Sequence, residues 1–301
     1  MASTMDDIKE LRERTGAGVL DCKKALNEKN GNVEEAVEYL REKGMAEAAK
    51  KAGRVASEGK VNVLLDKAEN EGIIVEVNSE TDFVAKNDNF QNLVDDISEH
   101  LLQSNVKNAN EALADSWYKD KSKEVNTVIK EAIANIGENI NLRRMKRFKA
   151  DKDEFLLDYI HMGGKIGVLV RFGGDLSEEN KQIAKNISMQ IAASSPEYID
   201  RNDVPEDVIE KEKKIYREQM LNEGKPEHIL DQIVEGKIDK FFNQICLLEQ
   251  EYIRDTDITA GEYLDGSDLE VRDFVRYELG EGIEEEEEDF ASEVMAEIED
   301  N

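Results

Sequence analysis

The stretch Ile73-Ile74-Val75-Glu76-Val77-Asn78-Ser79-Glu80-Thr81-Asp82-Phe83-Val84 contains the change of pattern that decides the fold. Residues 73–77 are β-branched apart from one glutamate, which predicts a strand. Residues 78–82 are polar and predict a turn. An amphipathic helix should follow, because apolar residues then recur at helical spacing: Phe90, Leu93, Val94, Ile97 and Leu101. The chain therefore passes from strand through turn to helix.

This arrangement recurs further along the chain. Residues 61–65 should pair with residues 73–77 as a hairpin, and residues 155–160 precede a second strand at 166–172. A glycine-rich turn follows the second hairpin, and then an apolar-faced helix begins. We interpret this as an internal repeat of two β-α units, near residues 60–140 and 150–280.

The N-terminal segment has helical periodicity instead. Residues 6–43 predict three short helices, the first broken at Thr15-Gly16-Ala17-Gly18. Asn32 should cap the third helix, and Gly44 should end it as a C-cap. Residues 45–58 predict a connecting helix that is mostly solvated. Three helices in so few residues make a compact bundle.

Two further segments stand out in the second half. Pro205 and Gly224-Lys225-Pro226 mark the start and the turn of a helical hairpin at about residues 200–246. Its apolar stripe needs cover from the sibling helix or from a second subunit, so a homodimer is one interpretation. The tail carries an unbroken acidic run from 284 to 289, followed by a predicted final amphipathic helix through Phe290, Val294 and Ile298.

Composition limits the partners. The 301 residues carry a net charge of −29, which disfavours direct binding to nucleic acid and favours a protein partner with a basic face. The basic cluster at 143–147 could contact phosphates, but a solvated strand or loop edge is the better interpretation. We find no membrane span and no secretory signal. The cysteines Cys22 and Cys246 are far apart, which fits a reduced, cytoplasmic protein without a disulfide framework.

Catalytic motifs are missing from the sequence. The three histidines, His100, His161 and His228, are far apart, and neither cysteine belongs to a metal-binding or redox motif. Residues 162–166 superficially resemble a phosphate loop but lack its Ser or Thr and its upstream glycine spacing, so a glycine-rich strand entry is the better interpretation. We therefore expect no enzyme activity, no cofactor and no metal site.

Several segments, collinear over nearly the whole chain, together resemble the elongation factor Ts family of long bacterial type. The most recognisable is Asn78-Ser79-Glu80-Thr81-Asp82-Phe83-Val84-Ala85-Lys86. The others are residues 8–26, 161–170, 189–196, 224–226 with 234–237, and 275–283.

The resemblance implies an α+β fold. An N-terminal three-helix bundle like a ubiquitin-associated domain, with its connecting helix, would occupy residues 1–54. A duplicated α+β core with antiparallel sheets and packed helices would follow, as an N-subdomain at 55–145 and a C-subdomain at 146–283. The helical hairpin would be an insertion in the C-subdomain. An acidic module with the C-terminal helix would occupy residues 284–301.

The resemblance also implies a function. Such proteins bind elongation factor Tu carrying GDP and eject the nucleotide, which makes them guanine nucleotide-exchange factors and not enzymes. Thr81-Asp82-Phe83-Val84 would displace the Mg²⁺ that the partner holds. Phe83 would act as an apolar wedge between partner helices, and Asp82 would add charge and hydrogen bonding. Further partner contacts are implied for Val19, Leu20, His161, Gly163 and Gly164.

Alternatives remain for each of these roles. Phe83 could pack in its own core while Asp82 caps the following helix, and Val19 and Leu20 could be buried in the bundle. His161, Gly163 and Gly164 could form a plain turn. The main alternative function is an adaptor of the ubiquitin-associated type that binds partners without exchange. An enzyme using scattered carboxylates is a third, less specific one.

Overall fold

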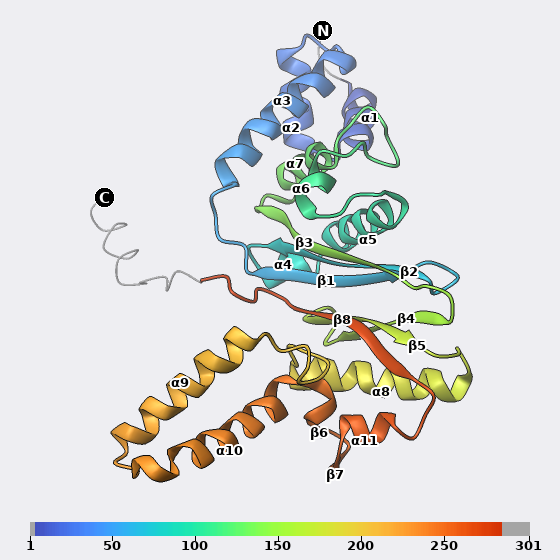
Figure 1. Ribbon diagram of the computed structural model, residues 1–301. Helices are drawn as coiled ribbons and strands as arrows, with labels where there is room; N and C mark the ends of the chain where they lie inside the picture. The colour runs from blue at the N-terminus through green and yellow to red at the C-terminus, as the bar shows by residue number, and fades with distance from the viewer. Residues whose placement is uncertain (1–3, 285–301) are drawn as a thin grey trace. The chain divides into compact units, whose positions relative to one another are not determined.

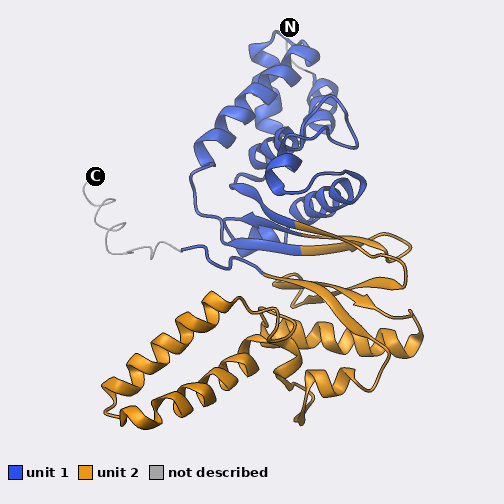
Figure 2. Cartoon of the chain, in the orientation of Figure 1, with its two compact units in different colours: residues 1–61, 75–145, 278–301 blue, residues 62–74, 146–277 orange. Residues whose placement is uncertain are grey.

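The structure is a computed structural model that describes residues 4–284, and its chain forms two compact units. Unit 1 contains the described residues up to 61, residues 75–145 and the segment from 278 (Figure 2). Unit 2 contains residues 62–74 and 146–277. The domain boundaries that the sequence predicts stay predictions, and the acidic module with its final helix through Phe290 lies outside the described residues, apart from Glu284.

The N-terminal bundle consists of helices α1 (Met5–Thr15), α2 (Val19–Glu28) and α3 (Val33–Lys51) (Figure 1). A capping box between Thr4 and Asp7 starts α1, and Asn32 caps α3 by accepting a hydrogen bond from the Glu35 N–H. The three helices enclose a small apolar core of Ile8, Leu11, Cys22, Ala25, Leu26 and Ala36. The predicted three-helix bundle is confirmed.

The predicted end of α3 is wrong. Gly44 lies inside the helix, which continues to Lys51, so the predicted connecting helix is largely an extension of α3. The reason for the glycine is packing. A Cβ atom on Gly44 would lie 2.8 Å from the Cβ of Ala134 in helix α7 (Val125–Ile136). Gly44 therefore permits α3 and α7 to approach closely, and it does not adopt the left-handed conformation of a C-cap.

This contact predicts an unusual response to mutation. In an exposed helix, glycine to alanine stabilises by up to about 1 kcal/mol. We expect Gly44→Ala instead to destabilise the protein by about 1–2 kcal/mol in a urea titration, because the added methyl group overpacks the contact. The swap Gly44→Ala with Ala134→Gly moves the methyl group to the other helix and should restore near-normal stability. A Gly44→Ala protein more stable than the wild type would contradict this packing.

The first sheet contains β1 (Glu58–Leu65), β2 (Glu71–Ser79) and β3 (Ile140–Lys149), in the order β1-β2-β3. Between β2 and β3 the chain forms α4 (Asp82–Ala85), α5 (Asp88–Gln103), α6 (Ala109–Leu113) and α7. The predicted apolar face of α5 is buried, including Phe90 and Ile97. The predicted strand and helix are confirmed, but the turn is shorter than the predicted 78–82, because β2 continues through Ser79 and α4 begins at Asp82.

The second sheet, in unit 2, repeats this plan. It contains β4 (Glu154–His161), β5 (Ile166–Gly173) and β8 (Glu270–Glu278), in the order β4-β5-β8. The β4-β5 pair is antiparallel, and helix α8 (Glu178–Ser194) packs on these two strands. The core between them includes stacked Phe155 and Phe172. In each sheet, two strands form a hairpin, and the third strand follows it in the sequence after intervening helices, as expected for an α+β fold with a duplicated core.

The remaining elements of unit 2 lie between α8 and β8. Helices α9 (Glu206–Asn222) and α10 (Glu227–Ile245) form the predicted helical hairpin, with Gly224 in the left-handed region at φ +75°. They are followed by a 3-10 turn η1 (Leu247–Glu249), β6 (Glu251–Tyr252), β7 (Asp255–Thr259) and α11 (Ala260–Leu264). Within residues 4–284, no helix has the length and apolar character needed to span a bilayer.

Candidate functional site

The loop Thr81–Val84 joins a strand to a very short helix. Strand β2 ends at Ser79, and α4 begins at Asp82. Thr81 is the N-cap, because its hydroxyl oxygen accepts a hydrogen bond from the Val84 N–H at 3.3 Å. The alternative in which Asp82 caps the helix is therefore wrong: its carboxylate instead pairs with Lys86 at 2.6 Å on the surface.

Phe83 is presented to solvent. Its side chain is 82% exposed, so the alternative in which Phe83 packs in its own core is wrong. Ala85, on the same short helix, is buried and provides the inward contact. An exposed phenylalanine on a loop between a strand and a helix resembles the anchors of protein interfaces, where aromatic side chains carry much of the binding energy.

Val19 and Leu20 also face solvent. They are the first two residues of α2, and their exposed fractions are 47% and 82%. The bundle core uses Cys22, Ala25 and Leu26 from the same helix, so the alternative that buries Val19 and Leu20 is wrong. Both exposed apolar positions and the Thr81–Val84 loop belong to unit 1.

His161, Gly163 and Gly164 lie in unit 2, at the hairpin between β4 and β5. His161 is the last paired residue of β4, opposite Ile166, and its Nδ1 lies 3.1 Å from the Tyr159 hydroxyl oxygen. Gly163 and Gly164 have φ values of +67° and +106°, which a tight turn between the strands requires. Met162 beside them is exposed. The turn interpretation is sufficient to explain both glycines; Gly163 is exposed at the hairpin tip, whereas Gly164 is buried.

Glu138 is a residue that the sequence interpretation missed. Its carboxylate accepts two hydrogen bonds from Thr81, one from the backbone N–H at 2.9 Å and one from the hydroxyl at 2.6 Å. The two residues are far apart in the sequence, so no periodic pattern links them. The only local indication is Gly137, a helix C-cap that places a carboxylate immediately after α7.

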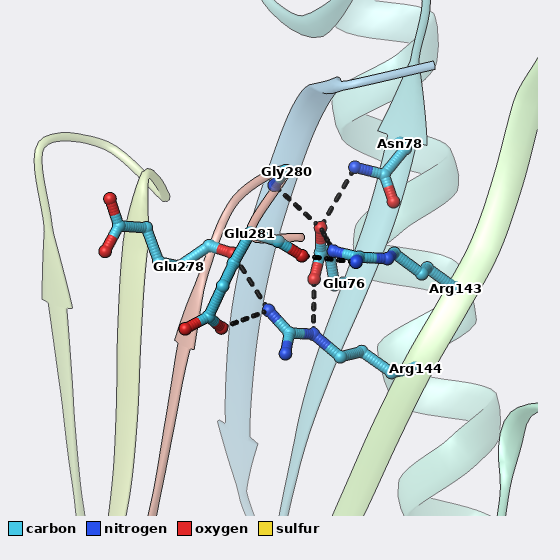
Figure 3. Close-up of polar contacts among 7 residues, drawn as sticks. All are labelled: Glu76, Asn78, Arg143, Arg144, Glu278, Gly280 and Glu281. Atoms are coloured by element: carbon cyan, nitrogen blue, oxygen red, sulfur yellow. Dashed lines mark hydrogen bonds and ion pairs between the residues drawn. The ribbon is translucent and has the colours of Figure 1, made fainter. Parts of the chain in front are cut away.

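A fully buried carboxylate, Glu76, organises another part of unit 1. Glu76 on β2 is fully buried and accepts hydrogen bonds from Arg143 at 2.9 Å, Arg144 at 2.5 Å, Asn78 at 3.0 Å and the Gly280 N–H at 2.9 Å (Figure 3). Arg143 and Arg144 also bond to the last residue of β8 and to the segment that follows it. The Arg144 guanidinium donates to the carbonyl of Glu278 at 2.9 Å and pairs with the Glu281 carboxylate at 3.1 Å.

These contacts change the interpretation of the basic cluster. Arg143 and Arg144 lie on β3, and their side chains are only 24% and 28% exposed. Arg147 pairs with Glu71 at 2.6 Å. The three arginines therefore bind carboxylates of the same chain. A strand location is correct, but the cluster is less solvated than the sequence predicts.

Glu76 is held in its ionised form. Burial alone would raise the pKa of this carboxyl group, but the hydrogen bonds from Gly280, Asn78 and Arg143 and the charge of Arg144 outweigh it and hold the pKa below its ordinary value. A buried carboxylate with this many donors is a structural anchor between β2, β3 and the segment that follows β8.

The two cysteines and His100 are buried. Burial, together with nearby carboxylates led by Glu249, raises the pKa of Cys246 to about 12, and burial also raises the pKa of Cys22. His100 is buried against Trp117, and burial lowers its pKa. Within residues 4–284, no group of three or more His, Cys, Asp or Glu residues is arranged to hold a metal ion.

Comparisons with known proteins cover these same residues. The family model described as Elongation factor TS matches residues 80–281. Elongation factor Ts of Halothermothrix orenii is 61% identical over 298 residues, with 99% of each chain covered. Proteins of the same name from Trichlorobacter lovleyi and Clostridium botulinum are each 48% identical, with 98% and 97% of each chain covered. The matched region begins at Glu80, directly before the Thr81–Val84 loop.

Proposed function

Because this chain belongs to the elongation factor Ts family, we propose that it is a guanine nucleotide-exchange factor for elongation factor Tu. It would bind the GDP-loaded partner, promote release of GDP and allow GTP to bind during translation elongation in the cytoplasm. The observation that carries this proposal is the exposed Phe83 on a loop that Glu138 anchors.

The function needs no covalent chemistry and no cofactor of the chain's own. An exchange factor must bind the nucleotide-free partner more tightly than the GDP-loaded one. By thermodynamic linkage, the factor by which GDP weakens this binding equals the factor by which the protein weakens GDP binding. Each tenfold weakening corresponds to about 1.4 kcal/mol of coupling free energy.

The Thr81–Val84 loop would supply this coupling. Phe83 would insert between partner helices, and the inserted ring would displace the elements that hold Mg²⁺ and the phosphates of GDP. The partner belongs to the phosphate-loop GTPases, in which Mg²⁺ and loop amides stabilise the bound phosphates, so their displacement weakens GDP binding. Asp82 would add charge and hydrogen bonding at the rim of this contact.

Other surfaces would add affinity. Val19 and Leu20 on α2 would contact the partner through their exposed apolar side chains. The hairpin tip with His161, Gly163 and Gly164 would form a separate contact from unit 2. The α9–α10 hairpin would provide a homodimer surface, since Ile215 and Leu221 on α9 are exposed apolar residues.

The direct kinetic test measures release of a fluorescent GDP analogue from elongation factor Tu in the presence of excess unlabelled GDP. Substoichiometric amounts of this protein should accelerate release about tenfold or more, because each molecule turns over on many partner molecules. Binding to the partner without faster release would instead support the adaptor alternative, and unchanged release would refute the exchange proposal.

A further inference from the structure

The conformation of the Thr81–Val84 loop must be fixed from outside the loop. Helix α4 has only four residues, and a helix this short is unstable by itself because its nucleation is costly. Phe83 adds little packing within the chain, since most of its side chain faces solvent. Contacts with other elements therefore decide where Phe83 points.

Glu138 supplies an external contact at the start of the loop, while at its end the Gln91 side-chain amide donates to the Ala85 carbonyl. Its carboxylate accepts both the N–H and the hydroxyl hydrogen of Thr81, at 2.9 and 2.6 Å. Hydrogen bonds to a charged acceptor are stronger than neutral ones. In return, the Asn139 N–H donates to the Glu80 carboxylate at 2.6 Å. Glu80 and Thr81 are thus joined to Asn139 and Glu138 by hydrogen bonds that run in both directions.

Glu138 is itself fixed by the end of α7. Gly137 adopts the left-handed conformation at φ +94°, and its N–H donates to the carbonyl of Ile133 at 2.9 Å. The side-chain amide of the buried Asn139 donates to the carbonyl of Arg54 at 2.8 Å. The carboxylate of Glu138 therefore projects from a well-anchored turn.

The same turn also contacts the N-terminal bundle. The Asn135 side-chain amide donates to the carbonyl of Thr15 at 3.1 Å, and the Lys51 ammonium donates to the carbonyl of Gly137 at 2.5 Å. Ala134 meets Gly44 in the close approach of α3 and α7. Residues 134–139, which we call the α7 junction, thus bond both to the bundle that carries Val19 and Leu20 and to the loop that carries Phe83.

We propose that Glu138 is a positioning residue for nucleotide exchange: it holds Thr81 and so fixes the direction of Phe83 before the partner arrives. The α7 junction forms hydrogen bonds both with this loop and with the bundle that carries the exposed start of α2. The proposal rests on the proposed exchange function. Its physical basis is preorganisation, because a loop that is already ordered does not lose conformational entropy on binding.

The first experiment compares exchange rates. Glu138→Ala removes both acceptors of Thr81, and we expect GDP release from elongation factor Tu to slow about tenfold, as expected for the loss of hydrogen bonds to a charged group. Glu138→Gln keeps one carbonyl oxygen and should recover part of the rate.

A matched control comes from helix α6. The Glu111 carboxylate accepts a backbone N–H from Lys107 and a side-chain N–H from Asn108, both at 2.9 Å, at the start of another short helix. Glu111→Ala removes an equivalent anchor in the same unit and should leave exchange unchanged. A Glu138→Ala rate within about twofold of the wild type would overturn the proposal, because a tenfold loss is expected.

The second experiment does not need the partner. Hydrogen–deuterium exchange on the free protein should show about tenfold faster exchange at the amides of Val84 and Ala85 in Glu138→Ala, with β2 and α5 unchanged. Unchanged protection of the loop, or faster exchange across the whole unit, would overturn a positioning role. If wild-type protein fails to accelerate GDP release while the loop still loosens in Glu138→Ala, the proposed function fails and the positioning of Phe83 stands.

Discussion

Phe83→Ala should slow GDP release from elongation factor Tu by roughly 30-fold or more, the effect of losing an interface anchor worth about 2 kcal/mol. The ring is 82% exposed, so its removal leaves no cavity and should change the free energy of unfolding by less than about 0.5 kcal/mol. Stopped-flow release of labelled GDP measures the first quantity, and urea denaturation measures the second. Replacing Asp82 as well should deepen the exchange defect with folding still intact.

The control for this prediction is another exposed apolar side chain in unit 1. Met5 at the start of α1 is 78% exposed, and Met5→Ala removes a similar apolar surface without touching the loop. It should exchange nucleotide normally. A Phe83→Ala protein that folds and releases GDP from the partner as fast as the wild type would contradict the wedge role of Phe83. One that unfolds would show instead that Phe83 supports the core.

Glu76→Ala should produce the largest loss of stability. Removing one member of a buried ion pair typically costs 3–5 kcal/mol, and about 3 kcal/mol is expected here because Arg143 and Arg144 retain some access to water. For a unit of this size the melting temperature should fall by roughly 6–12 °C. Differential scanning calorimetry of the full chain measures the change.

The matched control is Glu281→Ala. Its carboxylate pairs with the same Arg144 but is half exposed, so its loss should cost less than about 1 kcal/mol. Equal effects of the two substitutions would show that the buried network does not anchor the segment after β8.

The effect of Glu76→Ala should also depend on pH. The pKa of Glu76 is lower in the folded protein than in the unfolded chain. The ionised carboxylate therefore makes its full contribution to the stability of the folded state at pH values above the unfolded pKa. It is lost as the pH falls through the folded pKa. The difference in melting temperature between wild type and Glu76→Ala should therefore be largest near neutral pH and shrink in acid. A difference that stays constant down to the acid range would contradict an ionised Glu76.

Hydrophobic periodicity and turn residues were sufficient to predict the elements whose structure depends on neighbouring residues in the sequence. The strand at residues 73–77, the turn after it and the apolar face of α5 follow from residue order alone. The α9–α10 hairpin follows from Gly224 and Pro226. Each of these elements depends on neighbours a few residues away, and a single sequence contains that information.

Features that depend on distant contacts could not be predicted in this way. Gly44 is a C-cap by local rules, but the close approach to Ala134 overrides that expectation. Glu138 and Thr81 are separated in the sequence by the helices α4–α7, so only the folded chain brings them together. Glu76 is the one charged residue in the predicted strand at 73–77, and its partners come from β3 and from the segment after β8. The exposure of Phe83 likewise required the fold, because an isolated phenylalanine is more often buried.

The most direct test of the exchange account is a pair of binding measurements. Isothermal titration calorimetry would compare the affinity of this protein for nucleotide-free elongation factor Tu with its affinity for the GDP-loaded form. Binding to the nucleotide-free form should be tighter by about tenfold or more, and the same factor should appear when the affinity for GDP is measured with and without this protein. Equal affinities for the two forms would contradict the exchange proposal, since a protein without differential affinity cannot shift nucleotide binding.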